Sequence, residues 1–210
     1  NWFGLTGILA LLSYTAAVVF SPLAYPGYDW MSQAVSDLSA QDAPSRILWD
    51  RLAAVYGACS VVCMTCVAIY VSDKKINTKL FRVGIYLFTV MNWISKIGYS
   101  MFPLTDSGKE ITTFDEIMHI VVTIAVVALS IGSLVILIIV GFRKTGIRGI
   151  SVWSAIALAM MFIGAVGKEA VPPEYFGIVE RFSVFAAVGF TAVLGVYLFT
   201  GFHETKQNKA

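Results

Sequence analysis

Six long apolar stretches, separated by short segments that carry charges, prolines and glycines, dominate the sequence. They cover about residues 3–21, 47–72, 80–102, 115–141, 150–168 and 177–201. A helix needs about 20 mostly apolar residues to cross a bilayer, and backbone groups in lipid must find their hydrogen-bond partners within the segment. We therefore expect an all-α polytopic membrane protein, a single domain built as a bundle of six transmembrane helices.

The composition excludes water-soluble classes. Apolar residues make up 58% of the chain and charged residues 13%, with a mean hydropathy of +0.77. The few charges are scattered and near balance at +2, which argues against disorder and against nucleic-acid binding. The first stretch has no Lys or Arg and runs directly into Pro22, so we expect a membrane span there and not a cleaved signal peptide.

Basic and acidic residues fall in alternate connections between the stretches. Nine of the fifteen basic residues lie in the second and fourth connections and the C-terminal tail: Lys74, Lys75, Lys79, Arg82, Arg143, Lys144, Arg148, Lys206 and Lys209. Eleven of the thirteen acids, and all six prolines, lie in or beside the other connections. Because basic loops stay in the cytoplasm, we expect a multi-pass cell-membrane protein with both termini cytoplasmic and the proline-bearing connections outside.

The longest of these connections, residues 22–46, carries apolar residues at helical spacing. The residues are Trp30, Met31, Val35 and Leu38. This pattern predicts a short amphipathic helix lying in the membrane interface, with aromatic anchors at headgroup level. The alternative is a lid over the bundle, with Ser36 and Asp37 directed inward.

Lys96 is an ionisable residue within the third apolar stretch. Asn92, Lys96 and Tyr99 share one helical face by their spacing. Lys96 either extends to the headgroups along its own stem or belongs to an inner polar cluster.

The fourth stretch begins with a polar stripe formed by Asp115, His119 and Thr123, each one helical turn from the next. A carboxylate at this distance orients an imidazole and raises its basicity. The alternative is that His119 is a structural residue held by hydrogen bonds. Thr113 and Glu116 form a capping-box pattern at the start of the same helix.

Further charges stand at the outer ends of the last two stretches, as Lys168-Glu169 and Glu180-Arg181. They fit interfacial ion pairs of small energetic value. Together with Asp37, Lys96 and His119 they also fit a hydrated pocket that opens outward.

Three short motifs follow one another along the chain. They are Ser36-Asp37-Leu38, the run from Met101 to Asp106 followed by Asp115 and His119, and Gly177-Ile178-Val179-Glu180-Arg181. In order and spacing they resemble the bacterial and archaeal integral membrane family catalogued as domain of unknown function 998, over nearly the whole chain. The resemblance implies a six-helix membrane protein with recurring polar residues on its outer side, here Ser36, Asp37, Pro103, Asp106, His119 and Arg181. It implies no activity.

Cysteine and metal chemistry receive little support. Cys59, Cys63 and Cys66 are the only cysteines and follow helical spacing in one stretch, so we interpret them as small packing residues and not as a redox pair with a relay. The two histidines fall on opposite sides of the membrane. A zinc site needs several clustered ligands, and one histidine on each side cannot supply them. A divalent ion among the outer carboxylates is possible in principle, but no spacing requires it, and we expect no cofactor.

Two functions of different class remain. The first is a membrane protein that binds a lipid or small amphiphile in an outward-facing polar pocket, with ligand contacts from Asn92, Lys96, Tyr99, Asp106, Glu180 and Arg181. The second is an intramembrane lipid hydrolase or transferase with His119 as general base, Asp115 or Asp37 orienting it, and Ser36 or water as nucleophile. Membrane lipids are the expected partners. Small residues such as Gly164, Gly167, Gly189 and Gly195 fit helix packing within one chain or in a homo-oligomer.

Overall fold

The computed structural model describes residues 1–104, 113–143 and 147–202, without the side chains of residues 168 and 169. Its α-helices are α1 (Leu5–Phe20), α2 (Arg46–Asp73), α3 (Lys79–Met101), α4 (Phe114–Arg143), α5 (Arg148–Ala170) and α6 (Phe176–Phe199). Short 3-10 helices occur at η1 (Trp2–Gly4), η2 (Ser21–Ala24), η3 (Ser36–Ser39) and η4 (Pro173–Tyr175). The all-α prediction with six long helices is confirmed.

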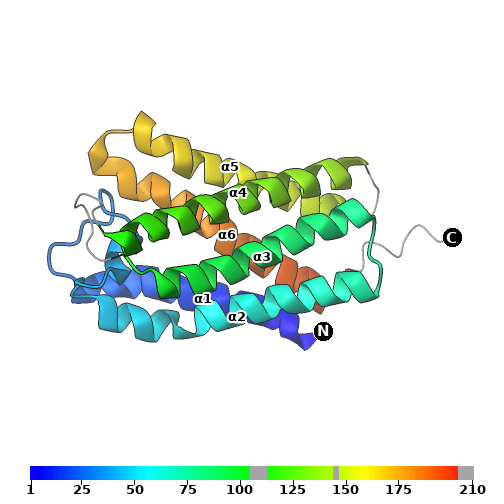
Figure 1. Cartoon of the computed structure of the whole chain (residues 1–210), viewed down its shortest axis with the longest axis horizontal. Coiled ribbons are helices and arrows are strands. Elements are labelled where there is room, and N and C mark those ends of the chain that lie inside the picture. The colour runs from blue at the N-terminus through cyan, green and yellow to red at the C-terminus, as the bar shows by residue number, and fades with distance from the viewer. Residues whose placement is uncertain (105–112, 144–146, 203–210) are drawn as a thin grey trace.

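Consecutive helices run antiparallel and pack side by side, and α6 closes the ring by packing against α1 (Figure 1). The connections that contain all six prolines lie together at one end of the bundle, which we call the proline end. The start of α1 and the end of α6 lie at the other end, which we call the basic end because the connection with Lys74, Lys75 and Lys79 is there.

Five of these helices are long and apolar enough to cross a membrane, and the protein is a helical membrane protein of several passes. The exception is α3, which has 23 residues and carries Arg82, Asn92 and Lys96. It runs the length of the bundle between α2 and α4 (Figure 1).

Local sequence explains where the helices begin and end. The Thr78 hydroxyl caps α3 by accepting from the Phe81 N–H at 3.1 Å, and α3 ends at Met101, just before Phe102-Pro103. At the end of α2 the Ile76 N–H donates to the Val71 carbonyl at 3.0 Å, the closing bond of a Schellman motif.

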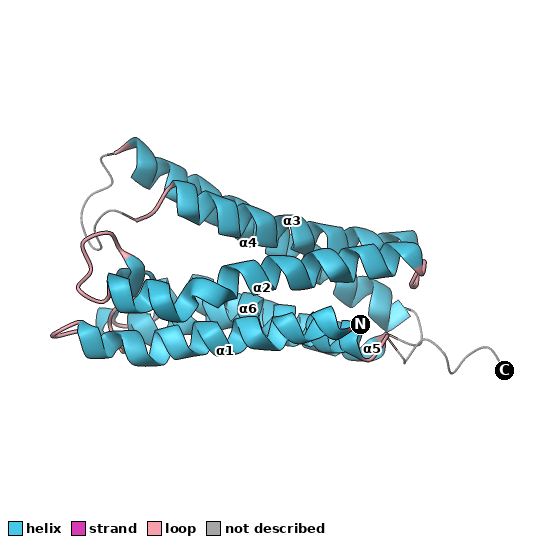
Figure 2. Ribbon diagram, turned by 90° about the horizontal axis from the view of Figure 1, so that it is seen from below, coloured by secondary structure: helices cyan, strands magenta, loops and turns pink. Residues whose placement is uncertain are grey.

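The two halves of the bundle pack differently. The main buried cluster lies toward the basic end and includes Val67, Phe81, Phe88, Leu137 and Leu194. In the half toward the proline end, α2 has no buried residue before Gly57, and α3 has only Gly98 after Asn92. Toward that end α3 and α4 also diverge from α1, α2 and α6 (Figure 2).

Small residues allow close helix contact inside the bundle. A Cβ at Gly167 of α5 would lie 2.9 Å from Val179 Cβ of α6, and one at Gly195 would lie 3.0 Å from Cys63 Sγ. Gly164 likewise faces Ser183, whereas nothing lies within 4 Å at Gly189. Since lipid tails are as apolar as the core, such packing stabilises membrane helices more than hydrophobic transfer does.

Candidate functional site

Arg181, in the second turn of α6, holds the loop after α1 against the bundle. Its Nη2 donates to Tyr28 Oη at 2.8 Å, and its Nη1 donates to the carbonyls of Gln33 at 3.1 Å and Gly177 at 2.6 Å. The guanidinium also lies 5.9 Å from the ring centre of Trp30. The donors of Arg181 are thus directed at protein acceptors.

Two further bonds join the same loop to α6. The Glu180 Oε2 accepts from the Val35 N–H at 3.2 Å, and the Ile178 N–H donates to the Met31 carbonyl at 3.3 Å. Val35 is 2% exposed and Leu38 is fully buried. The loop therefore docks on the bundle through its apolar residues.

The structure differs here from the expected interfacial helix. Residues 26–33 form turns and bends, and only Ser36–Ser39 is helical, as the 3-10 helix η3. Gly27 has a φ of +80°, a conformation that glycine adopts freely. Of the apolar residues at helical spacing, Val35 and Leu38 are buried against the bundle, whereas Trp30 is 54% exposed.

The pKa values of two side chains in the loop differ from their ordinary values. Burial raises the pKa of Tyr28, and the positive charge of Arg181 opposes that shift. The Ser32 hydroxyl and the Met31 N–H both donate to Asp29 and lower the pKa of its carboxyl group. Tyr28 is thus a neutral phenol at physiological pH, and Asp29 is an anion.

Ser36 and Asp37 are half-buried in this docked loop. Asp37 Oδ2 accepts from the Ala34 N–H at 3.1 Å, and the Ser36 carbonyl accepts from Ser39 Oγ at 2.9 Å. Asp37 therefore helps to shape the turn that leads into η3.

His119 lies half-buried between α3 and α4, in the half toward the proline end. Its Nδ1 is 2.8 Å from the carbonyl oxygen of Phe102, and its ring centre is 4.9 Å from that of Tyr99. A carbonyl oxygen only accepts, so Nδ1 carries the proton and Nε2 of the neutral ring keeps its lone pair. Phe102, and not Asp115, orients the imidazole.

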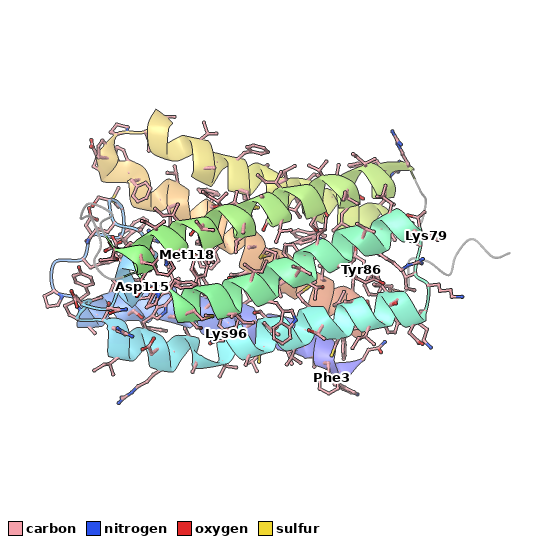
Figure 3. The ribbon with its side chains drawn as sticks, viewed as in Figure 1. Phe3, Lys79, Tyr86, Lys96, Asp115 and Met118 are labelled. Carbon is pink, nitrogen blue, oxygen red and sulfur yellow. The ribbon has the colours of Figure 1, made fainter. Side chains whose placement is uncertain are left out.

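The acids at the start of α4 have separate positions. Glu116 is buried, and it forms the expected capping box: its Oε2 accepts from the Thr113 N–H at 2.9 Å, and its own N–H donates to Thr113 Oγ1 at 3.3 Å. Asp115 is exposed at the end of the helix (Figure 3).

Thr123 extends the polar stripe below His119. Its hydroxyl donates to the His119 carbonyl at 2.9 Å and accepts from Tyr99 Oη at 3.1 Å. Tyr99 and His119 are thus brought together, as the sequence allowed. Asn92 is separate: it is buried and donates to the Phe88 carbonyl of its own helix at 2.9 Å.

Lys96 is exposed on the side of α3 that faces α2 (Figure 3). Its stem lies over Gly57, where a Cβ would be 2.6 Å from Lys96 Cδ and 3.1 Å from Nζ. The ion pairs of the described residues are Arg46–Asp50 and Lys74–Asp73. In this part of the chain the ammonium group of Lys96 therefore has no carboxylate partner.

A shallow apolar groove of about 330 Å³ lies on α3 beside Lys96. It is lined by Val90, Trp93, Ile94, Ile97 and Gly98. Trp93 is fixed by its Nε1, which donates to Thr65 Oγ1 of α2 at 3.1 Å. The groove thus offers apolar surface on the same helix as Lys96, reaching within one turn of it.

Some expected residues cannot be placed in this site. Asp106 lies outside the described residues. Among those described, no three His, Cys, Asp or Glu side chains come together as metal ligands. The three cysteines are free, and Cys63 is fully buried in the main core.

Sequence reasoning missed two tyrosines. Tyr14 of α1 and Tyr56 of α2 have ring centres 4.8 Å apart, and Tyr14 also packs edge-on against Trp49 and Phe185. The available signal was a hydroxyl group within each of the first two apolar stretches. Only the tertiary structure brings the two rings together.

The sequence profile of a family described as protein of unknown function (DUF998) matches residues 8–197. The chain belongs to the DUF998 family. Comparisons with curated proteins and with solved structures gave no match.

The polar residues that suggested DUF998 fall into two groups. Arg181 holds the loop that carries Ser36 and Asp37, and His119 bonds the carbonyl of Phe102, next to Pro103. Both groups lie toward the proline end of this DUF998 protein. Membership in the family assigns no activity. The function is therefore inferred from the charged and polar side chains that have no partner among the described residues.

Proposed function

We propose that this membrane protein binds a lipid or small amphiphile with a phosphate or other negative group in the half toward its proline end, with Lys96 as the ligand of that group. The observation that carries the proposal is the exposed ammonium of Lys96, which has no carboxylate partner among the described residues. An intramembrane charge is costly unless it is paired or hydrated. A phosphate at the membrane surface supplies the missing partner.

The surroundings of Lys96 fit an amphiphile. The groove along Val90, Trp93 and Ile97 offers apolar surface on the same helix, reaching within one turn of Lys96. The long stem of Lys96 rests on Gly57 and so directs the charge along the bundle surface. Arg181 fits a headgroup ligand less well, because its donors hold Tyr28, Gln33 and Gly177.

The proposal includes an orientation. Because basic connections remain cytoplasmic, the basic end with Lys74, Lys75 and Lys79 faces the cytoplasm, together with both termini. The proline end then faces out of the cell, and Lys96 meets the headgroups of the outer leaflet.

Native mass spectrometry of the protein released from nanodiscs tests this function. With phosphatidylglycerol and phosphatidylcholine in equal amounts, we expect the wild-type chain to retain phosphatidylglycerol preferentially. Lys96→Gln should lower that retention about tenfold, as expected for one charge-assisted contact. Arg51→Gln is the matched control, since Arg51 is an exposed base at the same end. Equal loss in both variants, or no preference in the wild type, would contradict the proposal.

One observation favours an alternative, an intramembrane lipid hydrolase. The Phe102 carbonyl fixes the His119 proton on Nδ1 and leaves Nε2 as a base. Thr123 and Tyr99 are bonded to one another, so water is the nucleophile that this arrangement favours. Hydrolysis would then require His119, whereas lipid retention would not.

A further inference from the structure

Glu180 is a carboxylate within α6 that the proposed function does not use. It is half-buried, and its Oε2 accepts from the Val35 N–H. No cationic nitrogen of the described residues lies within salt-bridge distance of it, because the ion pairs there are Arg46–Asp50 and Lys74–Asp73. The adjacent Arg181 points its donors at the loop instead. A membrane carboxylate in this state requires a proton or an external cation.

Two tyrosine hydroxyls lie near Glu180 and have no hydrogen-bond partner among the described residues. Tyr14 is 8% exposed, and neither it nor Tyr56 forms a hydroxyl hydrogen bond with any described residue. Neither hydroxyl oxygen is fully enclosed by protein atoms either. A buried hydroxyl normally finds a partner, so the two phenol oxygens retain hydrogen-bonding capacity for a ligand.

The three groups come from different helices and converge on one place. Tyr14 belongs to α1, Tyr56 to α2 and Glu180 to α6. The rings of Tyr14 and Tyr56 are in contact, and both pack in one apolar cluster with Val35, whose N–H donates to Glu180 Oε2. In this half of the bundle α2 has no buried residue before Gly57 and α3 has only Gly98 after Asn92, so the core beside these groups is sparse.

We propose that Glu180, Tyr14 and Tyr56 form a site for a protonated amine. An ammonium group has three N–H donors, which match the second carboxylate oxygen of Glu180 and the two phenol oxygens. The carboxylate supplies the countercharge, and the aromatic rings favour a cation nearby. This inference rests on the proposed lipid binding and specifies the headgroup: a phosphate for Lys96 together with an ammonium, as in phosphatidylethanolamine.

The test compares phosphatidylethanolamine with phosphatidylglycerol, which has the phosphate but no amine. Nanodiscs contain the two lipids in equal amounts, and native mass spectrometry measures which one stays bound. We expect the wild-type chain to prefer phosphatidylethanolamine about tenfold, since a charge-assisted contact is added. Glu180→Gln should abolish this preference while it keeps an acceptor for the Val35 N–H. Glu174→Gln is the matched control, because Glu174 is an exposed acid at the same end.

A second variant protects the test against a folding defect. Tyr56→Phe keeps the ring and its contact with Tyr14, and it should reduce the preference severalfold without loss of bound phosphatidylglycerol. Free ethanolamine competes for the same site, so its excess should remove the preference for phosphatidylethanolamine. A preference that persists in excess ethanolamine would count against an ammonium site.

The inference fails if Glu180→Gln and Tyr56→Phe leave the lipid preference unchanged while Lys96→Gln still lowers total retention. That pattern preserves the proposed function. If no lipid is retained by the wild-type chain, or Lys96→Gln has no effect, the proposed function itself fails.

Discussion

Arg181 illustrates how a single residue can be recognised as important while its role depends on tertiary contacts. Its place beside Glu180 at a helix start was visible in the sequence and suggested a headgroup ligand. Its partners Tyr28 and Gln33 lie about 150 residues earlier, and no local pattern predicts that contact. The same holds for His119, whose Nδ1 partner is a backbone carbonyl and not the carboxylate one turn away.

Arg181→Gln should destabilise the docked loop. Loss of charge-assisted bonds to Tyr28 Oη and the Gln33 carbonyl is expected to cost about 2 kcal/mol. Hydrogen exchange of residues 28–38 and thermal unfolding in detergent measure the effect. Arg46→Gln is the control, because the exposed Arg46–Asp50 pair at 3.7 Å contributes less than about 1 kcal/mol. Equal stability of the two variants would refute the role of Arg181.

The capping box at the start of α4 should contribute measurably to the stability of the protein. Thr113 and Glu116 exchange hydrogen bonds at the exposed first turn, so Thr113→Ala should lower stability by about 1 kcal/mol. Thr200→Ala removes a hydroxyl that bonds back to its own helix at 3.0 Å, and we expect a change below about 0.5 kcal/mol. Thermal unfolding of both variants checks the difference, which vanishes if the capping box contributes nothing.

At the scale of elements, the spacing of apolar residues did not predict the conformation of the loop after α1. Spacing of apolar residues indicated a helix at the interface, whereas close approach to α6 decides the conformation. Gly177 permits that approach: a Cβ there would lie 2.6 Å from the Trp30 carbonyl oxygen and 2.9 Å from Arg181 Nη1. The helix starts and ends, in contrast, follow from local caps and prolines, and they were predictable.

Gly177→Ala should therefore displace the loop, since backbone atoms cannot move aside locally. We expect a loss of stability of about 1–3 kcal/mol from overpacking and faster proteolysis within residues 25–40. At Gly189 nothing lies within 4 Å, so Gly189→Ala should be neutral or stabilise by up to about 1 kcal/mol through helix propensity. Limited proteolysis and unfolding of the pair provide the measurement, and similar behaviour of both would rule out this explanation.

At the scale of the whole molecule, the six helices were predictable because each lies in an apolar stretch of about 20 residues or more that is bounded by charge or proline. Observed helix ends such as Asp73 and Met101 lie within a residue or two of the expected ones. The alternating charge distribution fits the even number of antiparallel helices, with Asn1 and the end of α6 at the same end (Figure 1). The site was only partly predictable, because Glu180, Tyr14 and Tyr56 converge through helix packing.

The charge distribution also predicts the direction of insertion. In intact cells a membrane-impermeant maleimide should label Glu174→Cys and should label Lys74→Cys only after permeabilisation, because basic connections remain inside. The wild-type chain, whose cysteines lie within α2, serves as the blank. The opposite labelling would invert the assigned orientation.

The most direct test of the central claim is a time course of lipid composition in nanodiscs that hold the purified protein in a native lipid extract, followed by mass spectrometry beside a His119→Ala variant. Our account predicts that one phosphate-bearing lipid class stays enriched on the protein, equally in both variants, and that no lipid is converted. Conversion of a lipid class by the wild-type chain and not by His119→Ala would contradict a binding protein and establish an intramembrane enzyme.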